Sequence, residues 1–174
     1  MESSLKNMVL VLFTITLLSS AAVGGVYMLT EEPIAQAKVA AVNNALKQVL
    51  PEYEATTSQD IEVNALPVKV HTATVADKAV GYAVESTSKN GFGGAVRLMV
   101  GFDAEGTILN INVLEQKETP GLGTKMTDEG NVLLASLKGK DAAQVKMTVK
   151  KDGGDIDALT AATISSRAYA EAVA

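Results

Sequence analysis

A long stretch without charged side chains near the amino terminus constrains this chain more than any other feature of its sequence. Residues 7–30 contain no Asp, Glu, Lys or Arg. A helix needs about 20 predominantly apolar residues to cross the hydrocarbon core of a bilayer. The sequence therefore predicts that residues 1–30 form a short cytoplasmic tip and a single transmembrane helix.

The charges that flank this stretch predict its orientation. Lys6 and the free amino group precede it, whereas Glu31 and Glu32 follow it. Lysine and arginine are enriched on the cytoplasmic side of membrane helices. We therefore expect the amino terminus in the cytoplasm and the rest of the chain on the extracytoplasmic side.

A cleaved signal peptide is the alternative to a membrane helix. Residues 8–18 could form its apolar core, and the small residues at 20–22 could form its cleavage site. The apolar sequence continues through residues 26–29, which favours a helix that is retained in the membrane. Both interpretations place the domain that follows in the same compartment.

The composition excludes several classes of function. The chain of 174 residues has a formal charge of −5, no Cys and one His. The negative charge removes the electrostatic basis for binding nucleic acid, which requires Lys and Arg to neutralise phosphates. The lack of Cys excludes a thiol nucleophile, an iron–sulfur cluster, a lipoprotein anchor and a structural zinc site within this chain. Redox chemistry would therefore need an organic cofactor.

The single histidine is the one residue that could serve a catalytic triad. His71 lies in residues 68–74, where apolar and polar side chains alternate as in a strand. An ordinary sheet or surface histidine is therefore favoured over a catalytic base.

The rest of the pattern predicts an α+β fold. Residues 31–50 have helical spacing of apolar side chains and are followed by Pro51, so we expect a stalk helix. Residues 52–66 are polar and predict a connecting loop with at most an edge strand near 61–63. Residues 67–174 are expected to form the folded domain. Its strand-like runs are 67–75, 79–86, 95–102 and 107–114, its helical segments are 128–137 and 164–173, and residues 144–150 alternate as in a further strand. Short connections imply a mostly antiparallel sheet flanked by helices.

Residues 115–125 form a candidate ligand-binding loop. They contain Pro, two Gly, two Thr and charges of both signs. Glycine lets the backbone approach a ligand closely, while Thr hydroxyls and free amides can bond to ring heteroatoms. A solvated turn is the alternative, and it is favoured on the residues alone.

Residues 157–166 lie at the start of the last predicted helix. A phosphate group at a helix N-terminus meets unpaired amide donors and the positive end of the helix dipole, so a hydroxyl there is well placed to carry a phosphoester. Thr and Ser are also ordinary helix caps, and Thr160 or Thr163 could simply bind amides two or three residues on. On the residues alone, capping is favoured.

Together, the membrane helix and three motifs resemble a known family. The motifs are Gly91-Phe92-Gly93-Gly94, Lys117-Glu118-Thr119-Pro120-Gly121-Leu122-Gly123 and Thr160-Ala161-Ala162-Thr163-Ile164-Ser165-Ser166. Their order and spacing resemble the FMN-binding G subunits of the Rnf electron-transport complex, over nearly the whole chain. The C subunit of the sodium-translocating NADH:quinone reductase is related, and we rank it lower because its members tend to be longer.

The resemblance implies a cofactor and its site. FMN would be joined through its phosphate to the Thr163 hydroxyl, and a separate flavin transferase would install it from FAD with magnesium. Other residues implied to bind the cofactor are Glu118, Thr119, Leu122 and Gly123 at the isoalloxazine ring, Lys125 at the phosphate or ring edge, and Thr160, Ala162 and Ser165 in the last motif.

Ala161 departs from the family motif, which has Gly at this position. A positive backbone φ angle would strain alanine, whereas helical angles would not. We expect helical angles here because Thr163, Ser165 and Ser166 of the motif are kept.

The resemblance also implies a function. The chain would be one electron relay in an ion-translocating ferredoxin:NAD oxidoreductase complex of the bacterial inner membrane, with its domain in the periplasm. It would work with the other membrane and peripheral subunits and complete no reaction alone. The alternative outside the family is a membrane-anchored assembly or interaction module without cofactor.

Overall fold

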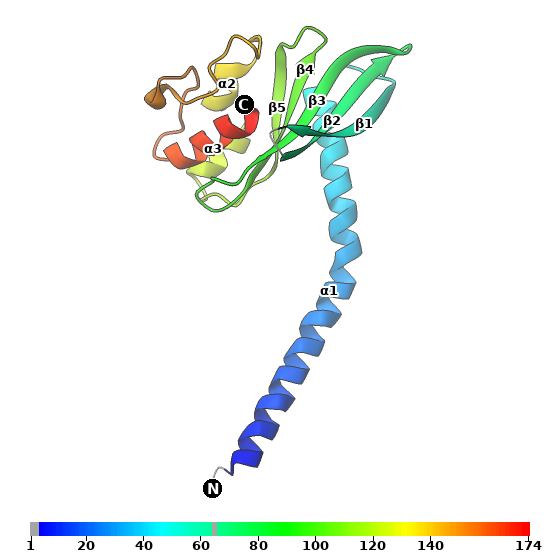
Figure 1. Cartoon of the computed structure of the whole chain (residues 1–174), viewed down its shortest axis with the longest axis vertical. Helices are drawn as coiled ribbons and strands as arrows, with labels where there is room; N and C mark the ends of the chain where they lie inside the picture. Colours follow the sequence, from blue (N-terminus) through cyan, green and yellow to red (C-terminus); the bar gives the residue numbers. More distant parts are fainter. Residues whose placement is uncertain (1–3, 64–65) are drawn as a thin grey trace. The chain divides into compact units, whose positions relative to one another are not determined.

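The computed structural model of the chain describes residues 4–63 and 66–174. It divides into two compact units, Met1–Ala41 and Val42–Ala174. The first unit holds helix α1 (Leu5–Val49) up to residue 41. The second holds the last turns of α1 together with the other helices and strands of the described residues (Figure 1).

Helix α1 contains the predicted transmembrane segment. Among residues 4–63 and 66–174, it is the one helix long and apolar enough to cross a membrane. Its side chains up to residue 41 are all exposed, as expected of a helix that faces lipid. The predicted stalk is not a separate element, because α1 continues through Pro33 and ends at Val49, close to the predicted stop at Pro51.

Five strands form one antiparallel sheet in the second unit. They are β1 (Ala55–Val63), β2 (Leu66–Val75), β3 (Lys78–Ser88), β4 (Val96–Asp103) and β5 (Ile108–Glu115), and they lie in this order across the sheet (Figure 1). Each strand pairs with the next one along the chain. The four predicted runs match β2 to β5 closely, and the predicted antiparallel sheet with flanking helices is confirmed.

The sheet begins earlier than the sequence predicted. β1 occupies residues that we expected to form a connecting loop with at most a short edge strand. All nine of its residues are exposed, so it lacks the alternation of apolar and polar side chains that identifies a half-buried strand. Its conformation is held instead by the ladder to β2, which runs from Ala55 opposite Thr74 to Val63 opposite Leu66.

Four short helices follow the sheet in the sequence: η1 (Gly123–Thr127), α2 (Val132–Leu137), η2 (Lys150–Asp152) and α3 (Thr163–Val173). Helix α2 starts later than predicted because the Asn131 side chain caps it and accepts a hydrogen bond from the Leu134 amide. The strand predicted at residues 144–150 is wrong. Its apolar side chains do pack against the core, but its backbone hydrogen bonds to residues 154–156 produce an isolated bridge between Val149 and Ile156 in place of a strand.

Apolar side chains cover both faces of the sheet. On one face, Leu98 of β4 packs in a buried cluster with Leu133 of α2 and Tyr169 of α3. On the other face, Val49 at the end of α1 packs with Met99 of β4. β4 therefore lies at the centre of the core, and α3 is fixed against it.

His71 lies in β2, as its alternating run predicted, and it belongs to a line of polar side chains across the sheet. Its Nε2 is 2.8 Å from Glu85 Oε1, and its Nδ1 is 2.8 Å from Ser58 Oγ. Arg97 donates to the other oxygen of Glu85. Burial raises the pKa of the Glu85 carboxyl, but hydrogen bonds and charges from Arg97 and His71 outweigh burial and hold this pKa below its ordinary value.

Candidate functional site

A pocket of about 600 Å³ opens where three separate segments of the second unit meet. The segments are the loop after β3, the loop after β5 and the start of α3. The residues that line the pocket are Phe92, Thr119, Leu122, Gly123, Ala161, Ala162, Thr163, Ile164 and Ser165. Its volume is ordinary for a cofactor site, which is typically apolar with a few polar groups. All three sequence motifs therefore contribute to one pocket.

Most of the residues predicted to bind a cofactor lie in this pocket. Thr119, Leu122, Gly123, Ala162, Thr163 and Ser165 line it, whereas Glu118, Lys125 and Thr160 do not. Phe92, Ala161 and Ile164 also line it and were missed as site residues. A second hollow of about 510 Å³ beside β5 and α2 contains none of the predicted residues.

The exposed ring of Phe92 is a notable feature of the pocket. This side chain is 68% exposed although it is large and apolar. An aromatic ring that packs on so little protein surface is suited to contact a planar ligand. The sequence did contain the signal, since Phe92 stands between Gly91 and Gly93 in the first motif.

Thr163 is the first residue of α3 and does not cap it. The cap residue is Ala162, and no side chain accepts a hydrogen bond there. The alternative that Thr160 or Thr163 is simply a helix cap is therefore wrong. The first amides of a helix have no partner within it, so an uncapped N-terminus leaves donors for an anion.

Ser166 holds the turn that precedes Thr163. Its fully buried hydroxyl donates to the Ala162 carbonyl and accepts from the Leu159 amide, both at 2.9 Å. The Ala162 amide also donates to the Leu159 carbonyl at 3.2 Å. These three hydrogen bonds fix the backbone that presents the Thr163 hydroxyl.

Ala161 has a positive φ angle of +61°, so our expectation of helical angles at this position is wrong. The left-handed region costs a residue with a side chain roughly 1–2 kcal/mol, whereas glycine adopts it freely. The glycine of the family motif would therefore fit this backbone better. The two hydrogen bonds of Ser166 and the one between the Ala162 amide and the Leu159 carbonyl hold this strained turn.

Glu118 is a buried carboxylate that joins the three pocket segments. It is 4% exposed. Its Oε1 accepts from the Gly93 amide at 3.0 Å, and its Oε2 accepts from the Ser165 hydroxyl. Glu118 therefore lies behind the pocket wall and links the Phe92 loop, its own loop and α3.

Two glycines allow these segments to approach one another. A Cβ atom at Gly93 would lie 1.7 Å from the Lys117 carbonyl oxygen, and a Cβ at Gly123 would lie 2.5 Å from Ser165 Oγ. Both distances are far below ordinary contact, so any side chain would push the loops apart. These positions need glycine for close packing rather than for an unusual φ angle.

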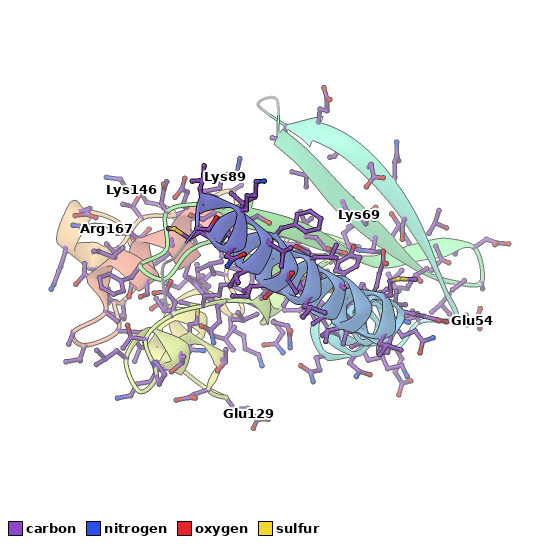
Figure 2. All side chains as sticks on the ribbon, turned by 90° about the horizontal axis from the view of Figure 1, so that it is seen from below. Glu54, Lys69, Lys89, Glu129, Lys146 and Arg167 are labelled. Carbon is purple, nitrogen blue, oxygen red and sulfur yellow. The ribbon has the colours of Figure 1, made fainter. Side chains whose placement is uncertain are left out.

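Positive side chains gather beside the start of α3. Arg167, labelled on α3 in Figure 2, pairs with Asp152 of η2 through two hydrogen bonds of 2.7 and 2.9 Å. Lys150 pairs with Asp157 at 2.7 Å. Lys151 instead donates to Thr163 Oγ1 at 3.4 Å. The hydrogen bond from Arg167 holds the pKa of Asp152 below its ordinary value, and the charges of Arg167 and Lys151 add to this effect.

Comparison with known proteins identifies the family. A model of the FMN-binding domain matches residues 91–174. The G subunit of the ion-translocating oxidoreductase complex of Shewanella amazonensis is 33% identical, in a match that covers 99% of this chain and 86% of that protein. The chain belongs to this family of G subunits.

Two further relatives in the family carry the same name. The protein of Vibrio vulnificus is 33% identical over 92% of this chain and 83% of its own length. The protein of Escherichia coli K12 is 42% identical over 60% of this chain and 52% of its own length. The predicted resemblance to the G subunits is thus confirmed.

The pocket of this G-subunit family member fits FMN. The FMN-binding domain begins at Gly91, so it includes all three pocket segments. Phe92, Leu122 and Ile164 offer apolar surface to a flat ring, and the uncapped start of α3 offers amides to a phosphate. The apolar side chains thus suit the flavin ring, and the start of α3 suits the phosphate.

Proposed function

We propose that this chain is an electron-transfer subunit of an ion-translocating ferredoxin:NAD oxidoreductase of the Rnf type, with FMN bonded to Thr163. The observation that carries the proposal is a pocket with apolar walls that has the Thr163 hydroxyl at the uncapped N-terminus of α3. The relatives are named as subunits of an ion-translocating oxidoreductase complex, which supports the reaction class. Bound FMN would supply reversible uptake of electrons, and the chain would set its position and surroundings.

Attachment of the cofactor is a transfer of a phosphoryl group from FAD. Thr163 Oγ1 bonds to the phosphorus of the FMN half, the pyrophosphate P–O bond to the AMP half breaks, and AMP leaves. The hydroxyl proton passes to a base of the separate flavin transferase, which also supplies the magnesium ion. No electrons are exchanged in this step. Because its hydroxyl accepts the FMN group, the chain is the substrate of the transferase. The fixed turn around Ser166 supports this role because it presents the hydroxyl in one position.

The remaining predicted residues would hold the flavin in different ways. Thr119, Leu122 and Gly123 would contact the ring from the loop after β5, since they line the pocket. Glu118 would act behind that wall through Gly93 and Ser165. A further set would act at the cofactor's edge or beneath its phosphate: Lys125, Thr160, Ala162 and Ser165.

The α1 helix would anchor this domain in the lipid of a bacterial inner membrane. Lys6 before the apolar segment and Glu31 and Glu32 after it favour a cytoplasmic amino terminus and a periplasmic FMN domain. Its partners would be the other membrane and peripheral subunits of the complex, together with the flavin transferase. Electrons would pass through this chain as one relay among several.

The test of attachment compares three variants of the full chain, each produced with the transferase. Thr163→Ala should abolish flavin fluorescence of the denatured band, whereas Thr163→Ser should keep part of it. Thr57→Ala, which changes an exposed threonine of β1 outside the pocket, should keep all of it. Fluorescence that persists in Thr163→Ala would reject the linkage. A colourless native wild-type protein would instead favour the module without cofactor.

A further inference from the structure

Lys151 occupies a special place among the cations near the pocket. Within residues 4–63 and 66–174, no carboxylate forms an ion pair with it, whereas its neighbours Lys150 and Arg167 pair with Asp157 and Asp152. Its ammonium group donates to Thr163 Oγ1 at 3.4 Å. Lys151 therefore directs its charge to the oxygen that carries the proposed linkage.

The position of Lys151 is fixed by the residue that follows it. Asp152 binds Arg167 through both of its carboxylate oxygens. Arg167 lies four residues after Thr163 on α3, so the two side chains share one face of the helix. The Asp152–Arg167 pair therefore fastens η2 to α3 and holds Lys151 beside the start of the helix.

We infer that Lys151 binds the phosphodiester at Thr163 and favours its formation, an inference that rests on the proposed function. A phosphodiester carries one negative charge, and a lysine ammonium is a compact donor for phosphate oxygens. Both oxygens of the Asp152 carboxylate accept hydrogen bonds from Arg167, so the ammonium of Lys151 can donate to a phosphate. The ammonium contacts Thr163 Oγ1, and the uncapped amides lie at the start of the helix that begins with Thr163, so both would attract a phosphate bonded there.

This assignment differs from the one that the sequence suggested. The resemblance to the G subunits implied that Lys125 faces the phosphate or the ring edge. It is exposed in η1 and does not line the pocket. Lys151 lies outside all three motifs, and only the fold brings it to Thr163.

The first experiment measures the rate of flavin attachment. The full chain in detergent is incubated with transferase, FAD and magnesium, and its intact mass is followed with time. Lys151→Ala should slow attachment about three- to tenfold, as expected for an exposed charge-assisted contact, and Lys151→Arg should restore most of the rate. Lys150→Ala is the matched control, because it removes the same charge from the adjacent residue and should leave the rate unchanged.

The second experiment separates contact with the phosphate from recognition by the transferase. The ³¹P resonance of the loaded full chain should move in Lys151→Ala but stay in place in Lys150→Ala. An unmoved resonance in Lys151→Ala would overturn the inference, even if attachment were slow, because the lysine would then serve only the transferase. A wild-type chain that gains no mass would overturn the linkage to Thr163 and the inference with it.

Discussion

Replacement of Glu118 by alanine should destabilise the FMN-binding domain by about 3 kcal/mol. The buried carboxylate accepts from the Gly93 amide and from the Ser165 hydroxyl, and alanine would leave both donors without their acceptor. A hydrogen bond to a charged group contributes roughly 1.5–3 kcal/mol, so two contribute about 3–6 kcal/mol. Burial of the charge has its own cost, which offsets part of that sum.

Glutamine at the same position should be much less harmful. Its amide oxygen can still accept from the Gly93 N–H, and its amino group can donate to Ser165 Oγ. Neutral hydrogen bonds contribute roughly 0.5–1.5 kcal/mol each, so we expect Glu118→Gln to cost about 1 kcal/mol. For a domain of this size, 1 kcal/mol corresponds to roughly 3–5 °C in Tm.

The assay is thermal unfolding of the full chain in detergent, followed by near-ultraviolet circular dichroism of the buried Tyr169. The matched control is Glu129→Ala, which removes an exposed carboxylate with the same change of charge. Glu118→Ala should lower Tm by roughly 10–15 °C and Glu129→Ala by less than about 2 °C. Equal values of Tm for the two alanine variants would refute the assignment of Glu118 as the link between the loops.

Two other predictions concern backbone strain and acid stability. Ala161→Gly should raise the free energy of unfolding by about 0.5–1 kcal/mol, because relief of the left-handed strain exceeds the entropy cost of glycine. The control, Ala168→Gly in the middle of α3, should lower this free energy by at least about 1 kcal/mol. A lower free energy of unfolding in both variants, measured by calorimetry, would contradict the assignment of strain to Ala161. The pKa of Glu85 is held below its ordinary value by Arg97 and His71 despite burial. The ionised carboxylate therefore contributes to the free energy of unfolding above about pH 4.3, and this contribution is lost as the pH falls through the folded-state pKa. Tm measured from pH 3 to pH 7 should therefore fall more steeply in the wild type than in Glu85→Gln, and parallel curves would count against the pairing.

The sequence predicted the strands that bury apolar side chains and missed the one that is exposed along its whole length. β3 alternates between buried and more exposed side chains, whereas β4 is buried or half-buried throughout and β5 nearly so. β1 is exposed along its whole length, so only its pairing with β2 makes it a strand. Residues 144–150 show the opposite error, since their alternation reflects contact with the core without a neighbouring strand.

The candidate site was predictable as far as its motifs extend. The loop around Thr119 was found through its glycines and hydroxyls, and the segment around Thr163 through its hydroxyls at the start of a predicted helix. The linking role of Glu118 was not predictable because it joins segments far apart in the chain. The contact of Lys151 with Thr163 was not predictable because it depends on how η2 is held against α3. The φ angle of Ala161 was misjudged because alanine, unlike glycine, does not indicate a left-handed backbone conformation in the sequence.

A covalent bond between FMN and the Thr163 hydroxyl is the central claim about this G-subunit family member. The most direct measurement is the intact mass of the full chain from cells that make the flavin transferase, followed by mapping of the modified peptide. We predict the mass of the polypeptide plus one FMN less one water, with the whole addition on the peptide that contains Thr163. The mass of the bare polypeptide, or a flavin on any other residue, would contradict the account.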